Sequence, residues 1–140
     1  MPVIDDATLR ELLAADTIAV IGCSTTPGKA AHEVPAYLQR QGYQVIPVNP
    51  FADEVLGVPA ADSLAAVEET VDLVDVFRPS EEVPEILEEV RERHASRDDA
   101  GDVWLQLGIA HDEATVAAEA DGLRVVQDRC IKVEHRRLLG

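Results

Sequence analysis

Short apolar runs alternate with amphipathic stretches along the whole 140-residue chain. Residues 17–21 (TIAVI) form an apolar run that ends at Gly22, which is typical of a strand buried on both faces of a sheet. Between residues 83 and 90, four apolar positions follow the i, i+3, i+4, i+7 spacing of one helix face. Runs of the first kind predict strands at residues 17–21, 43–48, 72–77, 102–107 and 123–126. Stretches of the second kind predict helices around residues 9–13, 31–41, 83–90, 116–120 and 130–139, with a short turn at 64–67.

Strands that alternate with helices predict right-handed crossovers and a parallel sheet. We therefore expect one domain over residues 1–140, an α/β fold of the Rossmann-like three-layer sandwich type with a parallel five-stranded sheet. A glycine-bearing loop follows the first strand, which favours the strand order 3-2-1-4-5 and a ligand site after strands one and four. Pro47, in the second strand, has no amide hydrogen, so it should sit at a strand end or on a free edge.

Acidic residues dominate the composition, with 27 Asp and Glu against 12 Lys and Arg and a formal net charge of -15. Nucleic acid and anionic membrane surfaces both require a basic face, so neither is expected as a partner. No apolar run is long enough to span a membrane, no secretory signal is visible, and two cysteines are too few for a disulfide scaffold. A cytoplasmic protein is predicted.

The basic residues are unusual, because only two are lysines and the other ten are arginines. A surface rich in carboxylates and poor in lysine suits a cytoplasm loaded with salt, where screening removes much of the repulsion. We therefore expect a halophilic protein, although acidity can also serve solubility alone. The acids are unevenly placed: residues 17–52 sum to +1, whereas residues 53–121 sum to -16. This distribution favours an anion-binding cleft beside the first two strands.

The loop at residues 22–29 (GCSTTPGK) lies between a predicted strand and a predicted helix, where free amides and a helix N-terminus favour phosphate. It misses the dinucleotide pattern G-x-G-x-x-G, and the second strand ends in Val48-Asn49-Pro50 without the expected acid. It also misses the Walker A pattern, because Ala30 stands where a magnesium-binding hydroxyl belongs. NAD(P) remains an alternative ligand, and a nucleoside triphosphate is less favoured.

Six segments together resemble the CoA-binding domain family, small Rossmann-like proteins similar to the N-terminal domain of the succinyl-CoA synthetase α subunit and to ADP-forming acyl-CoA synthetases. The resemblance covers nearly the whole chain and is carried by the order and spacing of the segments. They are IAVIGCSTTPGK at 18–29, QGYQVIPVNP at 41–50, VLG at 55–57, VDVFRP at 74–79, VWLQLG at 103–108 and VVQDRCIKVEHRRL at 125–138.

The resemblance implies that coenzyme A or an acyl-CoA lies across the carboxyl ends of the strands. Its phosphates would meet the glycine loop, its nucleotide the segments after the second and third strands, and its pantetheine the segment after the fourth. The implied cofactor-binding residues are Gly22, Ser24, Thr25, Thr26, Pro27, Gly28, Lys29, Asn49, Pro50, Phe77, Arg78, Pro79, Gln106 and Gly108. Two alternatives stay open: an NAD(P)-binding oxidoreductase, and an interaction subunit of an acyl-CoA synthetase-like complex, with a protein partner or a second copy of the chain.

The sequence contains no recognisable set of catalytic residues. No serine or cysteine is tied to a histidine and an acid by a recognisable motif, and no histidine pair has metal-ligand spacing. Cys23 and Cys130 are interpreted as small, partly buried residues. We therefore name no catalytic residue and no metal ligand, leave enzymatic activity open, and favour a binding protein.

Overall fold

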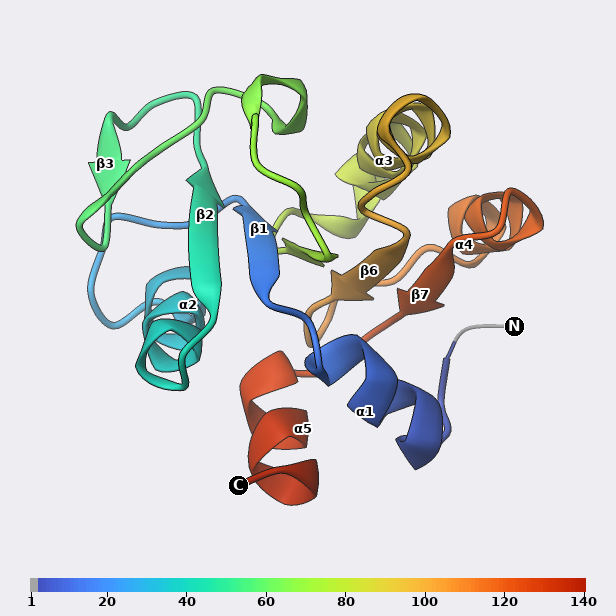
Figure 1. The fold of residues 1–140 in the computed structure, drawn as a ribbon, viewed down its shortest axis with the longest axis horizontal. Coiled ribbons are helices and arrows are strands. Elements are labelled where there is room, and N and C mark those ends of the chain that lie inside the picture. Colours follow the sequence, from blue (N-terminus) through green and yellow to red (C-terminus); the bar gives the residue numbers. More distant parts are fainter. Residues whose placement is uncertain (1–2) are drawn as a thin grey trace.

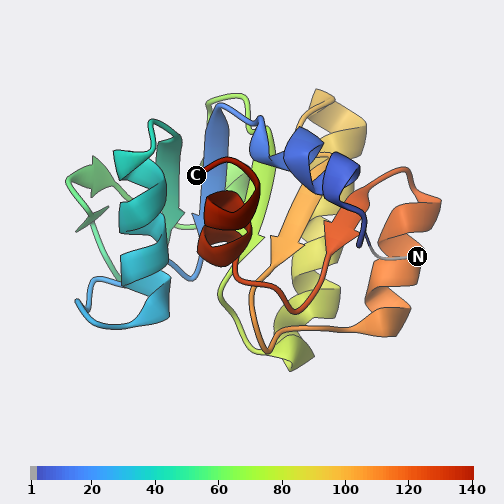
Figure 2. The same cartoon turned by 90° about the horizontal axis from the view of Figure 1, so that it is seen from below.

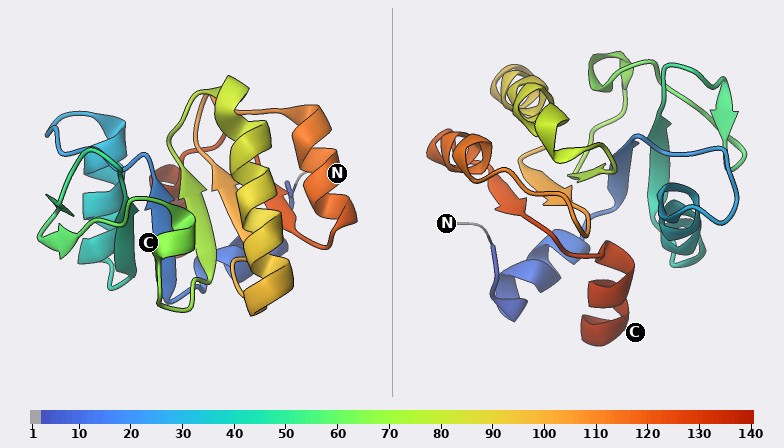
Figure 3. Two further views of the ribbon diagram at one scale, coloured as in Figure 1. Left: turned by 90° about the horizontal axis from the view of Figure 1, so that it is seen from above. Right: turned by 180° about the vertical axis from the view of Figure 1, so that it is seen from behind.

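The computed structural model describes residues 3–140 as three layers, with a five-stranded parallel sheet between two layers of helices (Figure 1). Helices α1, α2 and α5 cover one face of the sheet, while α3 and α4 cover the other (Figures 2 and 3). The strands are β1 (Thr17–Ile21), β2 (Gln44–Val48), β5 (Leu73–Val76), β6 (Asp102–Leu105) and β7 (Arg124–Val126), plus a small hairpin of β3 (Glu54–Val55) and β4 (Val58–Pro59). The helices are α1 (Asp6–Leu13), α2 (Ala30–Arg40), α3 (Val83–Arg97), α4 (Asp112–Ala120) and α5 (Ile131–Leu138), with 3-10 turns at Leu64–Ala66 and Ser80–Glu82.

The α/β class and the parallel five-stranded sheet are confirmed, and each expected strand and helix is present. Most ends shift by a few residues, but α3 extends to Arg97, seven residues beyond the expected stretch. The side of α4 that faces the core could not be predicted. Val116, Ala117 and Ala120 marked this helix in the sequence, but all three are exposed, and Thr115 and Ala118 are buried instead. The Thr115 hydroxyl donates a 3.0 Å hydrogen bond to the side-chain oxygen of Gln127, so its burial leaves no unpaired donor.

The expected strand order 3-2-1-4-5 is wrong. The observed order is β2-β1-β5-β6-β7, so the third sheet strand along the chain lies in the centre, between β1 and β6. The composition of β2 gives the reason. Pro47 cannot donate a ladder hydrogen bond, and an inner position for β2 would leave a neighbouring carbonyl without a donor. At the sheet edge β2 needs to pair fully with β1 alone, in accord with the expectation of a free edge for Pro47.

The outer edge of β2 is covered by an irregular segment, not by a further strand. Ala61 donates its N–H to the Pro47 carbonyl at 2.9 Å, and its own carbonyl accepts from the Asn49 N–H at 2.9 Å. The β3–β4 hairpin precedes this contact and turns through Leu56 and Gly57, both with positive φ. This covering leaves little of the β2 edge open to another chain.

The observed strand order places the topological switch point at a different position from the expected order. Connections leave β1 and β5 in opposite directions across the sheet, so the crevice lies between the carboxyl ends of these two neighbouring strands. The site is therefore expected at the loops after β1 and β5, and the earlier placement after the fourth strand is corrected. Within residues 3–140, no helix is long and apolar enough to cross a membrane.

Candidate functional site

A cleft of about 620 Å³ opens at the carboxyl ends of β1, β2 and β5, where the switch point lies. Its walls come from the glycine loop, the start of α2, the segment after β2, the turn at Leu64–Ala66, and the region joining β5 to α3. The side chains and backbone that line it belong to Ile21, Gly22, Cys23, Ser24, Lys29, Ala31, Val48, Asn49, Pro50, Phe51, Asp62, Ser63, Leu64, Phe77, Arg78, Glu82, Ile86 and Glu89.

Gly22 is the point where the glycine loop touches the segment after β5. Its φ is +84°, and a Cβ added there would lie 2.8 Å from the Arg78 Cδ and 2.9 Å from the Phe77 carbonyl oxygen. Only glycine fits both the backbone conformation and the close approach. The Gly22 N–H also donates to the Val48 carbonyl at 3.0 Å, so this residue joins the ends of β1, β2 and β5.

The rest of the loop is folded back on itself before α2 begins. The Ser24 N–H donates to the Ala31 carbonyl at 2.8 Å, and the Thr26 N–H donates to the Ser24 hydroxyl at 3.0 Å. Lys29 occupies the N-cap position of α2 and supplies no side-chain cap. Lys29 and Ala31 line the cleft, so a helix start whose N-cap side chain accepts no hydrogen bond borders this space.

Glu33 is the acid in the first turn of this helix. Interactions with the His32 side chain and with the Gly28 backbone hold the pKa of the Glu33 carboxyl below its ordinary value. Gly28, which the family resemblance implied as a phosphate contact, thus already interacts with an exposed carboxylate of the protein.

Asn49 connects two of the loops that form the cleft. Its side-chain amide donates to the Cys23 carbonyl at 3.0 Å, and its side-chain oxygen accepts the Phe51 N–H at 2.8 Å. Phe51 itself is 95% exposed at the cleft, an unusual position for a large aromatic ring. Asn49 thus fixes the shape of the wall and holds the backbone of an exposed aromatic residue beside the opening.

The charges of the cleft are mixed. Lys29 and Arg78 are cationic, but three carboxylates, Asp62, Glu82 and Glu89, line the same space. Burial, and to a smaller extent repulsion from neighbouring glutamates, raises the pKa of the Glu89 carboxyl above its ordinary value. Residues 17–52, which contain few acids, form only one wall of the cleft. Residues 53–121, which contain most of the acids, form the opposite wall.

Arg78 is engaged by a carboxylate of the protein itself. Its Nε and Nη2 donate to the two oxygens of Glu82 at 3.1 and 2.7 Å. This two-point ion pair raises the pKa of Arg78 and lowers that of Glu82. About half of each side chain remains exposed, 46% for Arg78 and 40% for Glu82.

The structure brings together half of the residues singled out in the sequence. Those that line the cleft are Gly22, Ser24, Lys29, Asn49, Pro50, Phe77 and Arg78. The others lie in the described chain but outside the lining: Thr25, Thr26, Pro27, Gly28, Pro79, Gln106 and Gly108. For the last two, the reason is the strand order, which places β6 beyond the switch point.

Gln106 takes part in a buried polar cluster instead. Its amide donates to the Asp75 carboxylate at 2.7 Å, and its oxygen accepts the Ile131 N–H at 3.4 Å. The other Asp75 oxygen has no hydrogen-bond partner within the described residues. Burial raises the pKa of Asp75 to about 7, and burial together with the charge of Asp75 raises the pKa of the Cys23 thiol to about 12. Cys23 is therefore a protonated, unreactive thiol at neutral pH.

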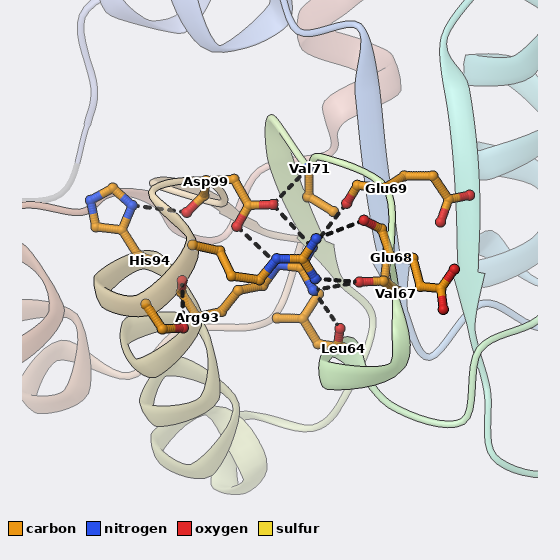
Figure 4. Close-up of polar contacts among 10 residues, drawn as sticks. Leu64, Val67, Glu68, Glu69, Val71, Arg93, His94 and Asp99 are labelled. Carbon is orange, nitrogen blue, oxygen red and sulfur yellow. Dashed lines mark hydrogen bonds and ion pairs between the residues drawn. The ribbon is translucent and has the colours of Figure 1, made fainter.

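A buried arginine on α3 supports the wall at Leu64 (Figure 4). Arg93 forms two hydrogen bonds to the Asp99 carboxylate, both at 3.0 Å. Its remaining donors reach the carbonyls of Leu64, Val67 and Glu69 at 2.7, 3.0 and 2.9 Å. All five guanidinium N–H groups are thereby used, and the irregular segment before β5 is held against α3.

Arg93 could not be singled out from the sequence, because arginine in an acidic helix is typical of a solvated face. The one available signal was its position, three residues beyond Val90 on the apolar stripe of the helix. Among residues 3–140, no three His, Cys, Asp or Glu side chains gather in a way that could hold a metal ion.

Fold and cleft together define a Rossmann-like α/β protein with a glycine loop and an open helix N-terminus at its switch point. Comparison with known proteins identifies the family within this class. The chain belongs to the CoA binding domain family, whose pattern matches residues 16–136.

Several relatives match this chain over nearly their whole length. The chain is 41% identical over 130 residues to the uncharacterized protein YneT of Bacillus subtilis, an alignment that covers 92% of this chain and 93% of YneT. A solved structure from Thermus thermophilus superposes with a TM-score of 0.88 at 45% identity, covering 97% of this chain and all of that one.

Part of the chain is also similar to much larger enzymes. It is 32% identical over 84 residues to the ADP-forming acetate–CoA ligase of Methanocaldococcus jannaschii, covering 60% of this chain but only 12% of the ligase. This chain is thus related to the N-terminal CoA-binding part of these ligases and spans a small fraction of their length.

Proposed function

We propose that this protein binds coenzyme A, or an acyl-CoA, in the cleft between the ends of β1 and β5. The observation that carries the proposal is the coincidence of two findings. The chain belongs to the CoA binding domain family, and a cleft of about 620 Å³ lies at the switch point, lined by part of the glycine loop and the start of α2. Ligase chemistry is not part of the proposal, because the related ligases are about eight times longer than the matched region.

The chemistry of coenzyme A suits the groups that line the cleft. The ligand carries a diphosphate and a 3′-phosphate, which need amide donors and at least one cation. The first turn of α2 supplies amides, and Lys29 and Arg78 supply the cations. Phe51, exposed beside the opening, offers a flat face on which an adenine ring can stack. We assign ligand contact to the expected residues that line the cleft, and not to Gln106 or Gly108.

A calorimetric titration with coenzyme A tests the proposal. We expect one binding event per chain, at low salt and in molar potassium chloride, and a rise in melting temperature with ligand concentration. Lys29→Ala should weaken binding by roughly tenfold or more, since a hydrogen bond to a charged group is worth about 1.5–3 kcal/mol. Arg40→Ala removes a positive charge from the other end of α2, outside the cleft, and should leave the affinity within about twofold.

The same titration separates this proposal from the alternative of a nicotinamide cofactor. NAD should produce neither heat nor a thermal shift at concentrations that saturate the protein with coenzyme A. A folded protein that ignores coenzyme A, or that binds NAD as tightly, would overturn the assignment.

A further inference from the structure

The cation that faces the glycine loop is already occupied by an anion. The Arg78 side chain crosses Gly22 so closely that a Cβ there would meet its Cδ at 2.8 Å. The end of that side chain is held by Glu82, with Nε and Nη2 donating to the two carboxylate oxygens at 3.1 and 2.7 Å. Both residues line the cleft, so this ion pair lies inside the proposed ligand site and not on a remote surface.

We propose that Glu82 is an internal competitor for the ligand: its carboxylate occupies the anion position on Arg78, and a phosphate of the bound coenzyme A displaces it. This inference rests on the proposed function and concerns how the same site sets its affinity. Glu82 therefore lowers the affinity of the cleft for a phosphate.

The geometry of the ion pair supports displacement. A guanidinium presents paired N–H groups that match the two oxygens of a carboxylate and equally those of a phosphate. Glu82 uses one such pair, so a phosphate cannot take the same edge of Arg78 while the carboxylate remains. A phosphate on a neighbouring edge would also lie against the negative charge of Glu82.

Separating Glu82 from Arg78 requires little free energy from either residue. The pair is nearly half exposed, 46% and 40%, and exposed pairs of this kind contribute little to stability. Glu82 remains hydrated after release, and it stands at the N-cap of α3, where the helix dipole favours a negative charge. No buried, unpaired charge is left behind, which distinguishes this pair from the buried pair of Arg93 and Asp99.

The test compares Glu82→Gln with Glu81→Gln in calorimetric titrations with coenzyme A. Both variants remove one negative charge from the same 3-10 turn, but Glu81 lies outside the cleft lining. If Glu82 competes for Arg78, Glu82→Gln binds coenzyme A about two- to fivefold more tightly than wild type, the range expected for an exposed ion pair. Glu81→Gln changes the affinity by less than twofold, and melting curves establish that both variants are folded.

A double-mutant cycle shows whether the effect acts through Arg78. In an Arg78→Met background, Glu82→Gln should no longer improve binding beyond the effect of Glu81→Gln, because the competitor has lost its target. Wild type that binds coenzyme A while Glu82→Gln matches Glu81→Gln, or binds more weakly, overturns the inference and leaves the proposed function standing. Absence of coenzyme A binding by folded wild type and by both variants overturns the proposed function itself.

Discussion

Arg93→Met removes a guanidinium whose five N–H groups all have acceptors in the protein interior. The side chains of Arg93 and its partner Asp99 are each only 4% exposed. Methionine has similar length but no charge, so the Asp99 carboxylate stays buried with the Val71 N–H as its remaining partner. The Glu69 carbonyl also loses its Arg93 donor, and the Leu64 carbonyl keeps only the Val67 N–H at 3.1 Å.

The magnitude follows from the burial of the pair. Removing one partner of a buried ion pair costs about 3–5 kcal/mol, because the other charge is left uncompensated. Unfolding of a chain of 140 residues has an entropy of about 0.3 kcal/mol per kelvin, so the melting temperature should fall by roughly 10–17 °C. Such a loss is a large part of the total stability of about 5–15 kcal/mol that is usual for a domain.

Urea and thermal unfolding at neutral pH measure this loss, with Arg91→Met as the matched control. Arg91 is on the same helix and contacts Asp121 at 2.6 Å, but these side chains are 36% and 50% exposed and the pair should contribute at most about 1 kcal/mol. The reasoning fails if the two variants unfold with free energies within about 1 kcal/mol of each other.

The pH dependence provides an internal check on the cause. In wild type, burial opposes ionisation of Asp99, but the hydrogen bonds from Arg93 and from the Val71 N–H outweigh it and keep the pKa below the usual value. In Arg93→Met the pKa of the buried Asp99 carboxyl should rise instead. The deficit of the variant should therefore shrink as the pH is lowered through that raised pKa, because the carboxyl takes up a proton in the folded state.

Three further predictions concern the cleft and the cluster beneath it. Gly22→Ala should destabilise the protein by about 1–2 kcal/mol more than Gly28→Ala, measured by urea unfolding. Both glycines have positive φ, but only Gly22 has neighbouring atoms that an added Cβ would contact. Equal losses of stability in the two variants would contradict this close contact. Asp75 has a folded pKa raised to about 7, above its unfolded value near 4, so its contribution should make stability fall as the pH rises between these values, by at most about 1.4 kcal/mol per unit. Asp75→Asn should remove that component, and an unfolding free energy whose difference from wild type is constant with pH would refute it. A thiol reagent at pH 8 should label native protein only at the partly exposed Cys130, since Cys23 is buried with its pKa raised to about 12; labelling that survives Cys130→Ser would show the opposite.

The strands and helices were readable from the chain because each is a local pattern of apolar positions. The strand order was not, because several orders satisfy the same alternation of strands and helices. Pro47 held the missing information. A residue that cannot donate to a ladder belongs on an edge, and an edge position for the second strand leaves the third strand to lie in the centre.

The site was predictable where it depends on one continuous segment. Gly22, Ser24 and Lys29 of the glycine loop line the cleft, as the position of the loop between a strand and a helix indicated, whereas residues 25–28 do not. Contacts between distant segments were not predictable. The spacing of Arg93 from Val90 indicated at most that Arg93 faces the core. Its carbonyl partners on an irregular stretch, and the approach of Glu82 and Glu89 to the cleft, depend on how α3 packs.

A calorimetric titration of the folded protein with coenzyme A decides whether the cleft at the β1–β5 switch point holds this ligand. We expect saturable binding of one coenzyme A per chain, weakened roughly tenfold or more by Lys29→Ala and changed by no more than about twofold by Arg40→Ala. Folded wild type that gives no binding heat and no thermal shift with coenzyme A, or equal weakening by the two variants, would contradict it.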